Sequence, residues 1–360
     1  MRKNSQTLTT QSIPALIKQL AIPASIGMFF NTMYNVVDTF YAGLISTQAI
    51  SALTLSFMIF FLIIGFGYGF SSAITALLGN ALGKKRYKLA SIYAHKGLVF
   101  VPLIGLTLSI IGYFFAPSLF MFLGAKDEYL QISLDYINPI LFGAIFFMFN
   151  FSLNSILIAT GDTKTYRNSL IFGFFANLAL NPLFMYGFLF VPAMGIKGIA
   201  FATVLIQIIN MFYLFYKVLQ TKLIHFDKLE YFIPNLRIYK LFFTHGIPSS
   251  LNMLTMAIGS LILTYFVSHY GIQAVAGYGI GYRVEQLMLL PALGLSTAVL
   301  ALVSNNFGAK KYDRVIETLK VSLKYGFIIA TVGIIFLTIL GRLIISLFDS
   351  NPIVVDFGVS

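Results

Sequence analysis

Long apolar stretches, separated by short polar segments, dominate the chain from residue 13 to residue 348. Each stretch is long enough, at 1.5 Å per helical residue, to cross a hydrocarbon layer about 30 Å thick. The pattern therefore predicts an all-α integral membrane protein. Nine spans are expected, roughly at residues 13–43, 50–80, 94–123, 130–158, 168–190, 195–219, 240–268, 274–306 and 322–348.

The polar segments between these stretches alternate in charge. Lys and Arg gather at the N-terminus and in every second loop, whereas the alternate loops hold little more than Lys126 and Lys197. Such asymmetry predicts that the N-terminus and the basic loops are cytoplasmic. The formal net charge of +12 is then explained by membrane topology, and we expect the lipid bilayer rather than nucleic acid as the partner.

A long internal repeat is the second organising feature. Residues 21–87 align without a gap to residues 246–312, with 17 identities in 67 positions by direct comparison of the sequence. Duplication of this kind builds many transporters, in which two related halves move around a shared site. We expect a two-lobe transporter in which a polar linker, residues 220–239, joins the lobes.

The repeat also sets the expected size of each lobe. Residues 13–219 hold six spans and form a complete N-terminal lobe, whereas residues 240–348 hold three and form a partial C-terminal lobe. A full second copy would need about three further spans. The sequence therefore predicts a C-terminally truncated chain.

Composition argues against an enzyme. There is no Cys, and the four His residues are scattered without the spacing of a metal site or a catalytic triad. No nucleophile and base stand in a recognisable pattern. We expect neither catalysis nor an organic cofactor.

Asp38 is the main candidate for chemistry within the membrane. A charged residue in the middle of a span costs about 2.5–3.5 kcal/mol on insertion scales, so such residues are seldom without a function. Asn31, Asn35 and Asp38 follow an i, i+4, i+7 spacing on one helical face, bordered by Tyr34. A carboxylate away from water can take up a proton near physiological pH. The alternative is an interfacial carboxylate solvated by water.

Further polar side chains lie in the fifth and sixth spans. Asn177 and Asn181 share a helical face, and Thr203 begins a polar series in the next span. Amide and hydroxyl oxygens beside one carboxylate suit a hard cation such as Na⁺. The same amides could instead join helices through hydrogen bonds, and this alternative also applies to Asn154 in the fourth span.

Six segments carry a resemblance to a known family. They are IPASIGMFFNTMYNVVDTFYAG from residue 22, GNALGKKRYKLA, ATGDTKT, NLALNPLF, MGIKGIAFATVL, and the long segment from YGIGYRVEQ to NNFGAKKYD. In this order and on these spans, the chain resembles the multidrug and toxic compound extrusion (MATE) transporters. Within them it is most similar to the DNA-damage-inducible-F-like branch.

The resemblance implies a function and a cation site. The family fold has twelve helices in two lobes, and the activity is export of drugs or metabolites against entering H⁺ or Na⁺. A bacterial inner-membrane location and small amphipathic, cationic substrates are expected, and we expect a monomer. The implied cation site, in the N-terminal lobe, maps onto Asp38, Asn177, Asn181 and Thr203. A second carboxylate that is frequent in relatives is replaced here by Asn181, which leaves H⁺ and Na⁺ both open.

The remaining candidate residues belong to the substrate path and to bending. Asn31, Tyr34, Asn35, Asn154, Arg283 and Glu285 are expected to line the cavity. Pro23 is a candidate hinge, because proline removes a helical hydrogen bond. Two alternatives stay open: a flippase for lipid-linked oligosaccharides in the same superfamily, and a truncated membrane protein that does not transport.

Overall fold

The computed structural model describes residues 7–346 and 352–359, which form long helices joined by short turns. The helices are α2 (Ile13–Ile45), α3 (Thr47–Gly83), α4 (Tyr87–Phe122), α5 (Asp127–Ala159), α6 (Lys164–Tyr186), α7 (Ile196–Leu219), α8 (Leu236–Ser268), α9 (Ile272–Gly308), α10 (Tyr312–Ser346) and the short α11 (Pro352–Val359). Each of the nine predicted spans therefore falls on one of these helices. The fifth predicted span, 168–190, is too long at its end, because α6 ends at Tyr186 and the chain turns there.

Length and composition single out most of these helices as membrane spans. Within the described residues, eight helices are long and apolar enough to cross a membrane. They are α2 to α7, α9 and α10, so α8, the seventh predicted span, is not among them. The chain is thus a multi-pass, all-helical membrane protein.

Two helices lie outside the predicted boundaries. The eight-residue α11 was not expected, because it is far too short to produce a membrane-spanning pattern. Helix α8 begins at Leu236, inside the segment predicted as a linker. Asn235 starts it, since its side-chain oxygen accepts hydrogen bonds from the amides of Arg237 and Ile238.

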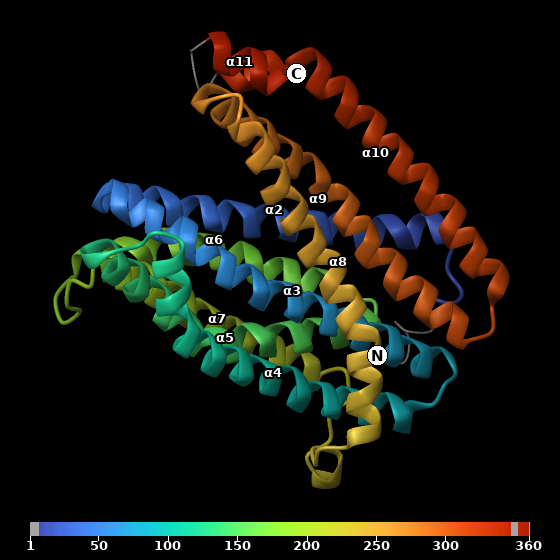
Figure 1. The fold of residues 1–360 in the computed structure, drawn as a ribbon. Helices are drawn as coiled ribbons and strands as arrows, with labels where there is room; N and C mark the ends of the chain where they lie inside the picture. The colour runs from blue at the N-terminus through green and yellow to red at the C-terminus, as the bar shows by residue number, and fades with distance from the viewer. Residues whose placement is uncertain (1–6, 347–351, 360) are drawn as a thin grey trace.

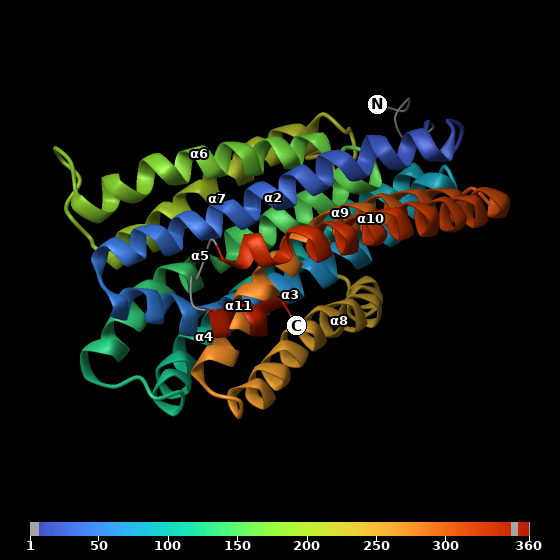
Figure 2. The same cartoon turned by 90° about the horizontal axis from the view of Figure 1, so that it is seen from above.

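The helices form two groups (Figures 1 and 2). Figure 1 shows α2 to α7 as one bundle, with α8, α9 and α10 crossing along one side of it. The two groups meet near the α3–α4 and α9–α10 turns and diverge towards α11. In Figure 2, α6 and α8 lie on opposite sides of the molecule, with α2 and α3 between them.

The two copies of the repeat adopt the same local structure at these turns. Lys85 and Lys310, which are equivalent in the repeat, both have positive φ, at 57° and 58°. The amide that follows each lysine donates back to the preceding helix, from Arg86 to Ala81 O and from Lys311 to Asn306 O, both at 2.9 Å. The shared sequence therefore encodes one helix–turn–helix unit twice.

Equivalent glycines bring the two groups into close contact. A side chain at Gly69 of α3 would lie 2.7 Å from the carbonyl oxygen of Gly246 in α8. In the other copy, a side chain at Gly294 of α9 would lie 2.8 Å from the carbonyl oxygen of Ala21 in α2. The contacts are reciprocal, as a pseudo-twofold arrangement requires. The helices can approach this closely because neither glycine carries a side chain.

The segment before α2 is held by the opposite group. Leu8 is 2% exposed and packs in a cluster that includes Leu295 and Leu302 of α9. Its carbonyl oxygen accepts from the Asn306 amide at 3.1 Å, and the Arg314 guanidinium donates to the Gln11 carbonyl oxygen at 2.6 Å. The start of α2 is therefore fastened to α9 and α10.

The linker is fastened to the first group. Ser91 of α4 donates to the Leu223 carbonyl oxygen at 2.6 Å, and Lys96 donates to the carbonyl oxygens of Glu230 and Ile233. The first turns of α8 then enter the core of the first group, where the rings of Phe100 and Phe242 are 5.4 Å apart. Segment 220–239 is thus packed against α4, and the start of α8 belongs to the core of the N-terminal group.

We expect Gly294→Val to destabilise the contact between the two groups. The added side chain meets backbone atoms of α2, and overpacking of this kind costs about 1–3 kcal/mol. Gly259→Val is the matched control, because no heavy atom of the described residues lies within 4 Å of its added Cβ. Thermal unfolding of the purified proteins in detergent tests this. Equal melting temperatures of the two variants would contradict a close contact at Gly294.

Candidate functional site

Asp38 lies at the centre of a buried polar cluster within the N-terminal group. Its side chain is on α2 and is 3% exposed. The side-chain amides of Asn177 and Asn181, both on α6, donate to its Oδ1 at 2.8 and 2.9 Å. The Thr203 hydroxyl of α7 donates to its Oδ2 at 3.2 Å. Three helices therefore bring four sequence-predicted residues together.

The two asparagines also hold each other. Because they are four residues apart, their side chains share one face of α6, and each amide nitrogen lies 3.2–3.4 Å from the oxygen of the other. Both are fully buried. The pair presents its N–H groups to the carboxylate as a fixed unit, and it also joins α6 to α2. The same two amides therefore contact Asp38 and join α6 to α2. Their role in binding a cation stays a prediction.

The cluster holds a carboxylate without a cationic partner. Two ion pairs occur among the described residues, Lys197–Asp135 and Arg342–Asp356, and neither includes Asp38. Neutral donors reduce the cost of a buried charge but do not cancel it. In this arrangement the ionised form of Asp38 lacks a positive charge that a bound proton or metal cation would supply.

Two tyrosines lie near Asp38. Tyr34 precedes it by one helical turn and is buried, and its hydroxyl makes no hydrogen bond among the described residues. Tyr136, on α5, is close enough to interact electrostatically with Asp38. The sequence analysis did not select Tyr136, since nothing in its spacing distinguishes it from the other tyrosines. Tyr136 therefore adds α5 to the helices that surround the carboxylate.

Asn31 and Asn35 do not join this cluster. Asn31 is exposed, and the Asn35 amide donates at 2.9 Å to the Asn31 carbonyl oxygen of its own helix. The predicted polar stripe on α2 therefore has one buried member, Asp38, and two that lie outside the hydrogen-bonded site. Their proposed place on a substrate path stays a prediction.

The other predicted cavity residues are dispersed. Asn154 of α5 is buried, and its side-chain oxygen has no hydrogen-bond partner. Glu285 is exposed on α9. The side chain of Arg283 lies outside the described part of the structure, so the predicted charge pair in this helix cannot be placed. None of these residues contacts Asp38 in the described hydrogen bonds.

Pro23 lies inside α2 and is buried. Two residues further on, the Ser25 hydroxyl donates to the Ala21 carbonyl oxygen at 2.9 Å. The helix runs through this position as a single element from Ile13 to Ile45. Pro23 thus removes one backbone donor from the helix that carries Asp38, close to the contact with Gly294.

A buried carboxylate inside a multi-pass bundle with an internal repeat is typical of a membrane transporter. Comparison with known proteins identifies the family: the MatE family profile matches residues 23–183 and 248–360. The chain belongs to the MatE family. Both matched regions begin at or next to the equivalent prolines Pro23 and Pro248, as the repeat requires.

Relatives and solved structures are similar along nearly the whole chain. The probable multidrug resistance protein YoeA of Bacillus subtilis is 30% identical, over 97% of this chain and 77% of its own length. The FAD transporter of Shewanella oneidensis is 25% identical, over 99% of this chain and 78% of its own length. The outward-facing structure of a multidrug resistance MATE family transporter is 26% identical, with a TM-score of 0.89 and 99% of this chain covered.

These comparisons bear on two earlier predictions. The predicted family is confirmed, whereas the comparisons do not distinguish the DNA-damage-inducible-F-like branch. The predicted truncation is not confirmed, because the relatives align along 97–99% of this chain. The chain spans 77–79% of the relatives' own lengths. The idea of a partial second lobe is likewise not confirmed.

We expect Asp38→Asn to stabilise the protein at pH 8. Asparagine keeps the size of the side chain and removes a charge whose burial costs free energy, so the variant should melt at a higher temperature than the wild type. The difference from wild type should shrink as the pH falls, because protonation neutralises Asp38 in the wild-type protein. Thermal unfolding at pH 5 and pH 8 measures both effects.

Asp135→Asn is the matched control. This carboxylate is paired with Lys197 at 3.1 Å near the surface, so its loss should cost only about 0–1 kcal/mol. A lower melting temperature for Asp38→Asn than for wild type at pH 8 would contradict the account of an uncompensated charge.

Proposed function

We propose that this protein is a secondary-active exporter of drugs or metabolites, driven by a cation that enters through the Asp38 cluster. The observation that carries the proposal is a buried carboxylate held only by neutral donors, in a chain of the MatE family. The negative charge of Asp38 is stabilised by a bound cation. Asp38 can therefore take up that cation in one state and release it in another. Coupling follows if the two lobes change their relative tilt between the two states.

We favour H⁺ over Na⁺ as the coupling ion. Both amides direct their N–H groups at Oδ1, so Na⁺ would require them to rotate and present oxygen instead. A proton needs no such change. Oδ2 accepts only from Thr203, at 3.2 Å, among the described hydrogen bonds, which makes Oδ2 the natural place for the proton. Sodium bound by Asp38, Asn177, Asn181 and Thr203 is the second candidate.

We propose that Pro23 is the hinge of this mechanism. It lies fifteen residues before Asp38, or about 22 Å along the helix axis. A change at the carboxylate can be transmitted along α2, and the missing backbone hydrogen bond at Pro23 makes that point the easiest to bend. The neighbouring Gly294 contact joins the bend to the opposite lobe.

Small amphipathic cations are the proposed substrates. This choice rests on the resemblance to multidrug exporters and on relatives such as the probable multidrug resistance protein YoeA of Bacillus subtilis. Export by a monomer in the bacterial inner membrane, with the N-terminus in the cytoplasm, completes the proposal. The oligosaccharide flippase alternative would need several cationic residues in the cavity. Of the cations within the predicted spans, Arg283 is the one farthest from a span end, and the others lie nearer the ends.

Asp38→Asn should abolish export of a fluorescent cationic dye from proteoliposomes, because the variant cannot exchange a proton. In wild-type vesicles, an imposed pH gradient without Na⁺ should drive export, whereas a Na⁺ gradient without a pH gradient should not. Fluorescence of the released dye measures both rates.

Asp135→Asn is the control here too, and it should retain wild-type export because Asp135 lies outside the cluster. Export by Asp38→Asn at the wild-type rate would overturn the proposal as a whole. Export driven by Na⁺ alone would overturn the choice of ion and leave the role of Asp38 intact.

A further inference from the structure

The segment between α6 and α7 folds into a small hairpin. Phe188 and Val191 exchange two backbone hydrogen bonds, both at 3.0 Å. The amides of Met194 and Gly195 then bond to the carbonyl oxygens of Phe184 and Met185, at 2.9 and 3.1 Å. The hairpin is thus tied to the end of α6. In Figures 1 and 2 it projects beyond the ends of the neighbouring helices.

The tip of this hairpin is entirely apolar and exposed. Phe188 is 65% exposed, Leu189 82% and Phe190 98%. Leu189 has a φ of 51°, a backbone conformation that costs a residue with a Cβ about 1–2 kcal/mol. The fold accepts this cost at a position where glycine would avoid it. The tip therefore exposes large apolar side chains, and their contact with water would be unfavourable in free energy.

The position of the hairpin along the membrane normal follows from the charges on α6 and α7. From Arg167, the last basic residue on α6, to Tyr186 the helix rises about 28 Å. From Lys197 to Lys217, α7 rises about 30 Å. Both lengths match the hydrocarbon thickness of about 30 Å. The hairpin joins the two helices at the end of the hydrocarbon layer, opposite the basic loops.

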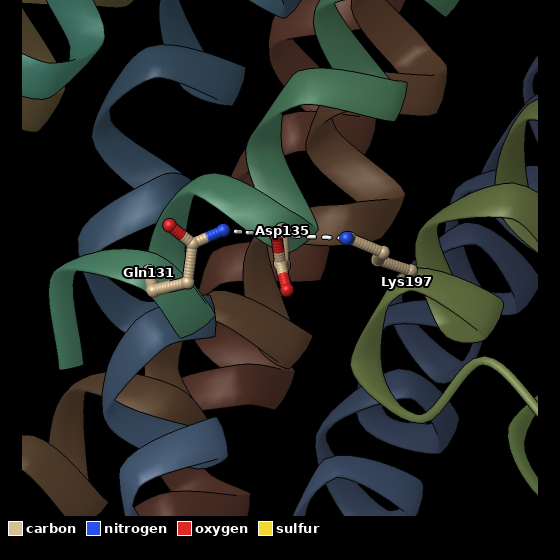
Figure 3. A network of polar contacts seen from close by, with 3 residues as sticks. All are labelled: Gln131, Asp135 and Lys197. Atoms are coloured by element: carbon tan, nitrogen blue, oxygen red, sulfur yellow. Dashed lines mark hydrogen bonds and ion pairs between the residues drawn. The ribbon is translucent and has the colours of Figure 1, made fainter. Parts of the chain in front are cut away.

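A polar network lies next to the hairpin, at the end of α7 that follows it (Figure 3). Lys197, in the first turn of α7, pairs with Asp135 of α5 at 3.1 Å, and Gln131 donates to Asp135 at 2.8 Å. The Lys197 side chain is half exposed. A solvated ion pair fixes this region as the boundary between lipid and water. Aromatic and large apolar side chains are favoured at that boundary.

We propose that the hairpin tip inserts Leu189 and Phe190 into the head-group and acyl boundary of the leaflet opposite the basic loops. Lipid is the occupant because the exposed apolar surface continues onto Tyr186 and onto Phe201 of α7, which face outward on the spans themselves. The segment between Arg167 and Lys197 carries no charge that would resist insertion. This anchor holds the ends of the two helices that carry Asn177, Asn181 and Thr203.

The absence of Trp from the chain allows a direct test. Phe190→Trp places a single fluorophore at the tip, and the protein is reconstituted in vesicles with bromine at a shallow or a deep position of the acyl chains. We expect blue-shifted emission, stronger quenching by the shallow bromines, and protection from aqueous acrylamide. An insertion depth of about 5–10 Å below the head groups is typical for such segments.

Two further variants complete the test. Phe114→Trp, on the exposed face of α4, serves as a reference for a fluorophore on a spanning helix. Leu189→Asp, added to Phe190→Trp, should shift the emission to the red and open the fluorophore to acrylamide. Folding of both Phe190→Trp proteins is checked by their melting temperatures.

Three outcomes would overturn the proposal. The first is a Phe190→Trp fluorophore that is fully quenched by acrylamide in vesicles. The second is emission that Leu189→Asp leaves unchanged, since the apolar tip would then not be the cause. The third is a blue shift that disappears as the protein is diluted with lipid, which would indicate a second copy of the chain as the partner. None of these measurements depends on transport.

Discussion

The constraint on which the rest of the molecule depends is the placement of one carboxylate in a membrane interior, where no cation of the described residues pairs with it. Asp38 accepts hydrogen bonds from two amides and one hydroxyl, and these neutral groups come from two other helices. Their donors must be held in place, because a displaced donor would leave the charge still less compensated. The packing of α2 against α6 and α7 is therefore a requirement of this site as well as of the fold.

The second constraint is the duplication. Reciprocal glycine contacts, Gly69 with α8 and Gly294 with α2, make the interface between the groups nearly symmetric. The site is not symmetric, since the position equivalent to Asp38 is Leu263. The two copies thus share their architecture and differ in their chemistry. The first copy carries the buried charge of Asp38. The second copy packs against the first through the equivalent glycine contacts.

Much of the fold follows from the sequence, because a run of about 20 apolar residues in a membrane leaves helix as the favoured local structure. The nine long helices, eight of which are apolar enough to span a membrane among the described residues, and the equivalence of the two copies could be predicted in this way. Helix α11 could not, because a helix of eight residues gives no such signal. The start of α8 was also missed, since its aromatic contacts with α4 depend on tertiary packing.

The candidate site was predictable in part for a related reason. The i, i+4 spacing placed Asn177 and Asn181 on one face, and that holds for any helix. The same rule grouped Asn31 with Asp38, but the two lie about 10 Å apart along the axis, and the amides of α6 reach only Asp38. Tyr136 escaped notice because no local pattern reveals which side chains of other helices approach Asp38.

The short segment in front of α2 has a mechanical consequence. Its backbone oxygens are grasped by Asn306 and Arg314 of the opposite group, while the helix that it leads into carries Asp38. If α9 and α10 move relative to the first group, either these hydrogen bonds break or the start of α2 moves with them. The segment therefore couples the position of α9 and α10 to that of α2, the helix that carries Asp38.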